Sequence, residues 1–220
     1  MQTENKILNV LGDSITQGAA ASDYSRIYHQ VLKELGGFKQ VRSYGVGGTR
    51  IARQFHPSAC ADWDRDFILR EKEMDKCADM VLVFGGTNDY GHGDAPFGEI
   101  GDSTAQTFCG ACKVLFENLR ADFPNATIIV LLPLRRLNED NVYGEYGNKA
   151  ACVGTLEDYS NALKTIAGQF NFPVCNLREE PLLNPNDPEL NEKYFGDGLH
   201  PNDAGHKILA KKIFAFMQQL

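Results

Sequence analysis

The 220-residue sequence has no long apolar segment and no excess of positive charge. Its longest apolar runs cover residues 80–84 and 126–133, whereas a membrane-spanning helix needs about 20 apolar residues. Asp and Glu number 29 against 22 Lys and Arg, which gives a formal net charge of −7. Nonspecific nucleic-acid binding requires a basic surface. We therefore expect neither a membrane span nor a nucleic-acid partner.

An apolar leader segment is also lacking. The first six residues are polar and have no apolar core of the kind found in signal peptides. We expect a cytoplasmic protein, or a secreted one from which a leader has been removed. The remaining composition, 43% hydrophobic and 23% charged, is typical of a globular chain that buries its own core.

Cysteine pairs with metal-site spacing are scarce. Of the six cysteines, at positions 60, 77, 109, 112, 152 and 175, only Cys109 and Cys112 form a Cys-x-x-Cys pair. A four-ligand zinc site needs a second pair, although an even number of cysteines also permits disulfides. Apolar residues recur at helical spacing around Cys109 and Cys112. We therefore expect free thiols, with these two buried in the core.

Apolar segments of strand length alternate with segments of helical spacing. The predicted strands are residues 7–11, 41–46, 80–84, 127–132 and 173–177, and the predicted helices are residues 23–35, 63–76, 104–122, 156–170 and 203–218. This alternation predicts an α/β fold, with a five-stranded parallel sheet and helices on both faces. No linker or repeat interrupts the pattern, so we expect a single domain over residues 1–220.

This architecture predicts where chemistry takes place. Ligands of open parallel sheets bind outside the carboxyl ends of the strands. In this chain, the segments that follow the predicted strands are residues 12–21, 45–50, 85–102, 133–154 and 178–201.

Ser14 directly follows the first predicted strand, in the segment Gly12-Asp13-Ser14-Ile15-Thr16. A serine in a tight turn between a strand and a helix can present its hydroxyl to a cleft as a nucleophile. The same position also favours a helix-capping serine. The G-x-S-x-G motif of the α/β-hydrolases does not match, because position 16 is Thr.

A serine nucleophile needs a base, and the chain has five histidines, at positions 29, 56, 92, 200 and 206. Only His200 follows a carboxylate at a spacing that one turn can close, in Asp197-Gly-Leu-His200. Asp197 would then fix the imidazole tautomer, leaving the other ring nitrogen free to accept the serine proton. A simple turn with a capping cluster is the alternative reading.

Two glycine-rich segments could supply donors to a developing oxyanion. Gly45-Val-Gly-Gly-Thr49 follows the second predicted strand, and Gly85-Gly-Thr-Asn88-Asp follows the third. Glycine lets a backbone N–H approach a ligand closely, and Asn88 offers a side-chain amide. Loop glycines and a turn asparagine would look the same.

The four segments together resemble those of the SGNH hydrolases, the GDSL-type esterases and lipases. They are Gly-Asp-Ser-Ile-Thr, Gly-Val-Gly-Gly-Thr, Gly-Gly-Thr-Asn-Asp and Asp-Gly-Leu-His-Pro, and they occur in the family's order between residues 12 and 201. The resemblance implies a flavodoxin-like three-layer α/β/α sandwich. One departure lies just before the second segment, in Ser43-Tyr44-Gly45, where many relatives have Asn in place of Ser43.

The resemblance also implies a role for each matching residue. Ser14 would be the nucleophile, His200 the base and Asp197 its orienter. The oxyanion hole would consist of the Ser14 N–H, the Gly48 N–H and the Asn88 amide, with Gly47 as the neighbour that is hard to tell from Gly48. The implied reaction is ester hydrolysis through an acyl-enzyme, and it requires no metal or organic cofactor.

The sequence says less about the substrate, a small-molecule ester. Residues 89–102 and 135–155 should wall the pocket, and they contain Tyr90, Phe97, Tyr143 and Tyr146, which could stack on a sugar or be ordinary rim residues. Arg135 and Arg136 could meet an anionic substrate or be solvated. Neither loop has a long apolar run, which favours short acyl groups, such as acetyl esters of carbohydrates, over a lipid.

Three alternatives remain at this stage. The first is a lipid acylhydrolase of the same family, of the lysophospholipase or thioesterase type. The second is a metal-dependent phosphoesterase, because Gly12-Asp13 and residues 87–89 faintly resemble the metal-ligand segments of such enzymes. The third is a non-catalytic α/β binding protein, although Arg50 stands where a dinucleotide fingerprint needs glycine. The sequence does not indicate an oligomeric state.

Overall fold

In the computed structural model, which describes residues 2–149 and 153–220, five parallel strands form one sheet. The strands are β1 (Ile7–Gly12), β2 (Gln40–Gly45), β3 (Met80–Phe84), β4 (Thr127–Leu131) and β5 (Val174–Cys175). They lie in the order β2-β1-β3-β4-β5, which is the flavodoxin-like order. The predicted parallel sheet and fold class are therefore confirmed.

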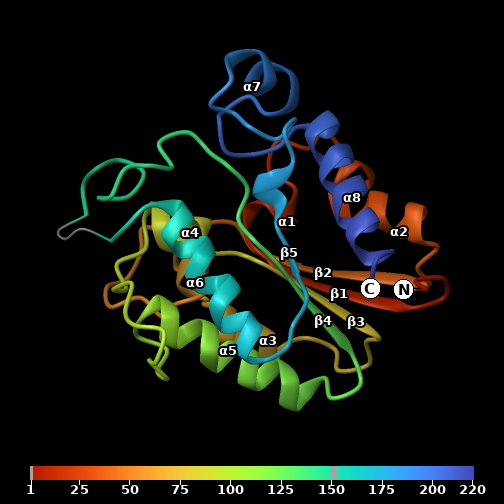
Figure 1. The fold of residues 1–220 in the computed structure, drawn as a ribbon, viewed down its shortest axis with the longest axis horizontal. Helices are drawn as coiled ribbons and strands as arrows, with labels where there is room; N and C mark the ends of the chain where they lie inside the picture. Colours follow the sequence, from red (N-terminus) through yellow and green to blue (C-terminus); the bar gives the residue numbers. More distant parts are fainter. Residues whose placement is uncertain (1, 150–152) are drawn as a thin grey trace.

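Helices cover both faces of this sheet (Figure 1). Because side chains of a strand alternate between its two faces, Leu8 and Val10 of β1 pack with α2 (Tyr28–Gly36) and α8 (Asp203–Met217). Leu11 lies on the opposite face, with α3 (Phe67–Lys72), α5 (Phe108–Asp122) and α6 (Leu156–Gln169). Two apolar cores thus hold a three-layer sandwich together.

Several elements differ in extent from the prediction. The segment expected as one helix over residues 23–35 is a 3₁₀ turn (Tyr24–Arg26) followed by α2, because Ile27 between them is extended. The segment expected over residues 63–76 is a 3₁₀ turn (Ala61–Asp64) followed by the shorter α3, whose first turn is capped by the side chain of Asp66. β5 ends early because a third 3₁₀ turn begins at Leu177.

Three short helices were not predicted: α1 (Ser14–Gln17), α4 (Thr87–Gly91) and α7 (Pro188–Tyr194). Helices of four to seven residues are too short to show an apolar period. The start of α7 was nevertheless readable, because Asp187 caps it and Pro188 occupies its first turn. The cap predicted for α8 is present, since the Asn202 side chain accepts hydrogen bonds from the N–H groups of Ala204 and Gly205.

The cysteines that the structure describes are free thiols, as expected. Cys109 and Cys112 are buried in α5, and burial raises the pKa of the Cys109 thiol to about 11. A thiol with such a pKa is a poor metal ligand or redox group at neutral pH. Cys152 lies outside the described residues.

Tyr28, His29 and His206 form a buried polar cluster that contacts α1 at Thr16. The Tyr28 hydroxyl lies 2.8 Å from Thr16 Oγ1, and His29 Nε2 donates to the Thr16 carbonyl oxygen at 3.1 Å. His206 stacks on the Tyr28 ring with centroids 6.0 Å apart, and its Nδ1 accepts the Tyr28 N–H. These contacts connect α2 and α8 to the short helix that begins at Ser14.

This cluster leads us to expect a loss of stability in mild acid. Burial lowers the pKa of both His29 and His206 from 6.5 to about 4. Between these values the unfolded chain binds protons that the folded chain does not, so the free energy of unfolding falls as the pH falls. Each histidine contributes on the order of 2 kcal/mol to the difference between pH 7 and pH 5. Asp13 partly opposes this loss, because burial raises its pKa to about 6.

Urea unfolding at pH 7 and pH 5 measures this difference. His206→Gln should reduce the pH dependence by about 2 kcal/mol, whatever its effect on stability at pH 7. The same pH dependence in the variant and the wild type would contradict the assignment.

Candidate active site

Ser14 is the first residue of α1 and follows directly on β1. The N-cap of this helix is Asp13, whose carboxylate accepts the Ile15 N–H at 3.0 Å. The capping interpretation of Ser14 is therefore wrong, because its neighbour caps the helix. The Ser14 hydroxyl instead lies 2.9 Å from His200 Nε2.

His200 and Asp197 form the local pair that their spacing predicts. His200 Nδ1 lies 2.6 Å from Asp197 Oδ2, while Oδ1 accepts the N–H groups of Leu199 and His200 at 2.9 and 2.7 Å. One carboxylate oxygen thus closes the turn and the other holds the imidazole ring. Burial alone would raise the pKa of Asp197, but these hydrogen bonds outweigh it and lower the pKa. Asp197 is therefore an anion beside the ring.

The glycine loop after β2 lies against Ser14. A Cβ added to Gly47 would come 3.6 Å from Ser14 Cβ. The Gly47 N–H already donates to Gln17 Oε1 at 2.7 Å. Among the residues that the structure describes, the Gly48 N–H has no hydrogen-bond partner. Gly48 has a φ of +72°, a conformation that favours glycine. Of these two neighbours, Gly48 is therefore the one whose N–H no described residue engages.

Asn88 joins the loops after β2 and β3. Its Nδ2 donates to the Thr49 carbonyl oxygen at 3.0 Å, and its Oδ1 lies 3.2 Å from His92 Nε2. An amide carries two N–H donors, and the second N–H of Asn88 has no partner in the described part of the chain. His92 is in the neutral state at pH 7, because burial lowers its pKa to about 4. The neutral ring can donate to Asn88 Oδ1 and hold the amide in one orientation.

Two buried charged residues that we did not predict hold this arrangement together. Arg70 donates to the carbonyl oxygens of Gly12 and Tyr44 at 3.0 and 2.6 Å and to Thr49 Oγ1 at 2.8 Å. The Asp89 carboxylate accepts two backbone N–H groups of residues 51 and 52 at 3.0 and 2.9 Å. Asp89 was recognisable by its place beside Asn88. Arg70 had no sequence signal, because it lies far from the motifs.

Two loop residues considered for substrate contact, Tyr90 and Arg136, are buried and bound to other residues of the chain. Tyr90 is fully buried, and its hydroxyl donates to the carbonyl oxygens of Asn138 and Asn141. Arg136 is also buried and forms an ion pair with Glu145 at 2.5 Å. Neither side chain is free to meet a substrate, so those suggestions are wrong.

Of the other loop residues considered for substrate contact, two contact neighbouring side chains and two are exposed. Phe97 packs edge-on against Tyr159, with ring centroids 4.8 Å apart. Arg135 pairs with Glu139 at 2.9 Å. Tyr143 and Tyr146 are exposed at the molecular surface.

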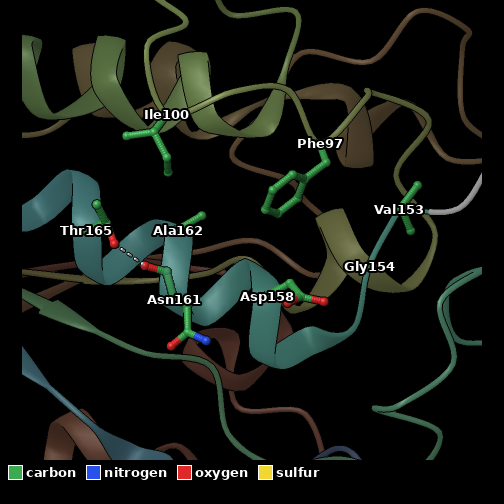
Figure 2. A pocket seen from close by; sticks show the side chains of 8 residues that line it. All are labelled: Phe97, Ile100, Val153, Gly154, Asp158, Asn161, Ala162 and Thr165. Atoms are coloured by element: carbon green, nitrogen blue, oxygen red, sulfur yellow. Dashed lines mark hydrogen bonds between the residues drawn. The ribbon is translucent and has the colours of Figure 1, made fainter.

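A cavity of about 530 Å³ adjoins the site at His92. Its polar lining consists of His56, His92, Asp94, Tyr146, Asn148 and Lys149. A second cavity, of about 480 Å³, lies along α6 and contains none of Ser14, Asp197 and His200 (Figure 2). The two cavities share Phe97 and Val153. The cavity at His92 does not contain Ser14, Asp197 or His200 either, but it adjoins the site through His92, which contacts Asn88.

Residues 2–149 and 153–220 contain neither a metal-binding cluster nor a helix that could span a membrane. No three His, Cys, Asp or Glu side chains are grouped so that they could hold a metal ion. None of the described helices combines the length and the apolar character that a membrane crossing requires.

Comparisons with known proteins extend over most of the chain. A Lactobacillus plantarum protein of known structure is 26% identical, with a TM-score of 0.82 over 98% of both chains. A protein described as a possible lipase from Chitinophaga pinensis is 25% identical, with a TM-score of 0.69 over 97% of this chain and 98% of the other. An acetyl xylan esterase shares the fold at 20% identity, with a TM-score of 0.61 over 95% of this chain and 98% of the other.

No curated protein matches the chain. The model of the GDSL-like Lipase/Acylhydrolase family matches residues 10–208, which include the segments around Ser14, Gly48, Asn88 and His200. The chain therefore belongs to the GDSL-like lipase and acylhydrolase family, whose enzymes act on esters.

Proposed function

We propose that this protein is a serine esterase that forms its acyl-enzyme on Ser14. The observation that carries the proposal is the continuous chain from the Ser14 hydroxyl through His200 to Asp197, with donor–acceptor distances of 2.9 and 2.6 Å. His200 Nε2 takes the Ser14 proton as Oγ attacks the ester carbonyl. Asp197 keeps the proton on Nδ1 and stabilises the imidazolium that forms.

The remaining steps return every group to its starting state. The tetrahedral intermediate collapses as His200 gives its proton to the departing alkoxide, which leaves as the alcohol. Water then attacks the acyl-enzyme, and His200 takes a proton from it. The second tetrahedral intermediate collapses as His200 returns this proton to Ser14 Oγ, which leaves the carboxylic acid as product. This mechanism needs no metal or organic cofactor, and it takes place within the domain that we propose for residues 1–220.

Three N–H groups are proposed to hold the oxyanion. The Ser14 N–H belongs to the first turn of α1, where backbone donors have no partner within the helix. The Gly48 N–H and the second amide N–H of Asn88 are the other donors that no described residue engages. Donors that are already held in place stabilise the intermediate without having to reorganise during the reaction.

Short acyl groups, such as the acetyl esters of carbohydrates, are the proposed substrates. The cavity beside His92 combines polar side chains with apolar ones such as Pro96, Phe97 and Val153. This mixed lining suits a sugar ring, which has both C–H faces and hydroxyl groups. The likeness to an acetyl xylan esterase supports the same class.

Hydrolysis of p-nitrophenyl esters from acetate to palmitate tests this proposal. We expect the highest kcat/KM with acetate and a steep fall beyond butyrate. Labelling by a phosphonate ester should add one phosphonyl group to Ser14, located by mass spectrometry, and should fail with Ser14→Ala. A preference for palmitate would favour a lipid acylhydrolase, and activity without labelling at Ser14 would contradict the mechanism.

A further inference from the structure

Trp63 is a partly exposed aromatic side chain that lies directly on the proposed oxyanion loop. Its indole occupies the space above Gly48, where any added Cβ would collide with the ring. The same indole lies 5.5 Å from the His92 ring, measured between centroids, and His92 holds Asn88. Trp63 thus contacts Gly48 and the ring that orients Asn88, yet 37% of its surface remains exposed.

A buried arginine fixes Trp63 in this place. Arg50 is 2% exposed and donates to the Gly48 carbonyl oxygen at 3.1 Å. It also forms an ion pair at 3.1 Å with Asp64, the residue that follows Trp63 in its 3₁₀ turn. Asp64 in turn accepts the Ser58 hydroxyl at 2.6 Å. The Arg50 guanidinium therefore connects the 3₁₀ turn that contains Trp63 to the glycine loop at Gly48.

The space beyond this indole is lined by both polar and apolar side chains. The cavity of about 530 Å³ begins at His92, against which Trp63 packs, and Asn148 and Lys149 line it as well. The Trp63 indole N–H has no hydrogen-bond partner in the described part of the chain. An exposed aromatic face beside hydroxyl-binding groups suits a molecule with one apolar face and a polar rim.

We propose that Trp63 contacts the substrate and selects esters whose alcohol part is a sugar ring. The C–H face of a pyranose would stack on the indole, and its hydroxyl groups would enter the cavity beyond His92. This inference rests on the proposed function, because it places the ring on the alcohol side of an ester that Ser14 attacks. It adds a specificity-determining residue that the motifs do not contain.

Two acetate esters separate this role from structural support of the loop. One is a monoacetylated methyl xylopyranoside, and the other is ethyl acetate, which is acyclic and cannot stack. p-Nitrophenyl acetate is unsuitable, because its flat ring could also pack on the indole. Acid release in a pH-stat measures both reactions.

We expect Trp63→Leu to lower kcat/KM for the sugar ester about tenfold, mainly through KM, since aromatic stacking has effects of this size. Any loss for ethyl acetate, which would come only through the loop, should be smaller, so the ratio of kcat/KM for the sugar ester to that for ethyl acetate should fall. Trp63→Phe should retain most activity on both esters, because it keeps a ring. Tyr143→Leu, which removes an exposed aromatic residue outside both cavities, should leave both reactions unchanged.

Trp63 is the only tryptophan in the chain, so its fluorescence reports binding directly. Titration of the Ser14→Ala protein with the sugar ester should give a saturable change in emission. Equal losses with both esters in Trp63→Leu would overturn the proposal, and so would hydrolysis of the sugar ester without a fluorescence change. A fluorescence change in Ser14→Ala, together with no hydrolysis of either ester by the wild type, would instead refute the proposed esterase function and leave the Trp63 contact standing.

Discussion

Substitution of Ser14 by alanine is expected to lower kcat for ester hydrolysis by about 10⁴–10⁶-fold. The alanine variant has no nucleophile, and the His200 base, 2.9 Å from Ser14 Oγ in the wild type, then has no proton to take. Steady-state hydrolysis of p-nitrophenyl acetate measures the loss. The fold should persist, because Asp13 rather than Ser14 caps α1.

His200→Ala and the double variant provide the control for this prediction. Residues that act as one unit lose activity non-additively. We therefore expect His200→Ala to fall into the same range and the double variant to be no worse than Ser14→Ala. A thermal unfolding midpoint close to that of the wild type would exclude misfolding. Activity of Ser14→Ala within tenfold of the wild type would rule out the acyl-enzyme mechanism.

The second large effect is expected for Asn88→Ala, with a loss of about 10²–10³-fold in kcat. The variant lacks the amide N–H that we assign to the oxyanion, a charge that exists only after the serine has attacked. KM should therefore change little, because the ground-state ester carries no such charge. Kinetics over a range of acetate ester concentrations separate the two parameters.

Asn88 also donates to the Thr49 carbonyl oxygen, so part of a loss could come from a displaced loop. The kinetic parameters separate the two causes, because a displaced loop should also change KM, whereas a lost oxyanion donor lowers kcat alone. Asn88→Asp keeps the shape of the side chain, removes both N–H donors and places a carboxylate beside the developing oxyanion. We expect it to be at least as inactive as Asn88→Ala. Full activity in either variant would show that the oxyanion is held without this residue.

The main outlines of this protein were readable from local sequence. Met80–Phe84 is continuous and apolar because β3 is buried on both faces between two helical layers, and such runs predict central parallel strands. The pairing of Asp197 with His200 could be predicted as well, since one turn brings together residues three positions apart. Short elements such as α1 and α4 escaped prediction, because one helical turn has no period to detect.

What local sequence determined is therefore the order of strands and helices, the two apolar cores and the residues that single turns bring together. Only the tertiary structure decided which distant groups meet. It brings Ser14 to His200 across 186 positions, engages the Gly47 N–H with Gln17, and sets Trp63 on Gly48 through Arg50. The physical reason is that such contacts depend on how separate elements pack against one sheet. The apolar periodicity of the sequence predicts each element by itself but not how the elements pack together.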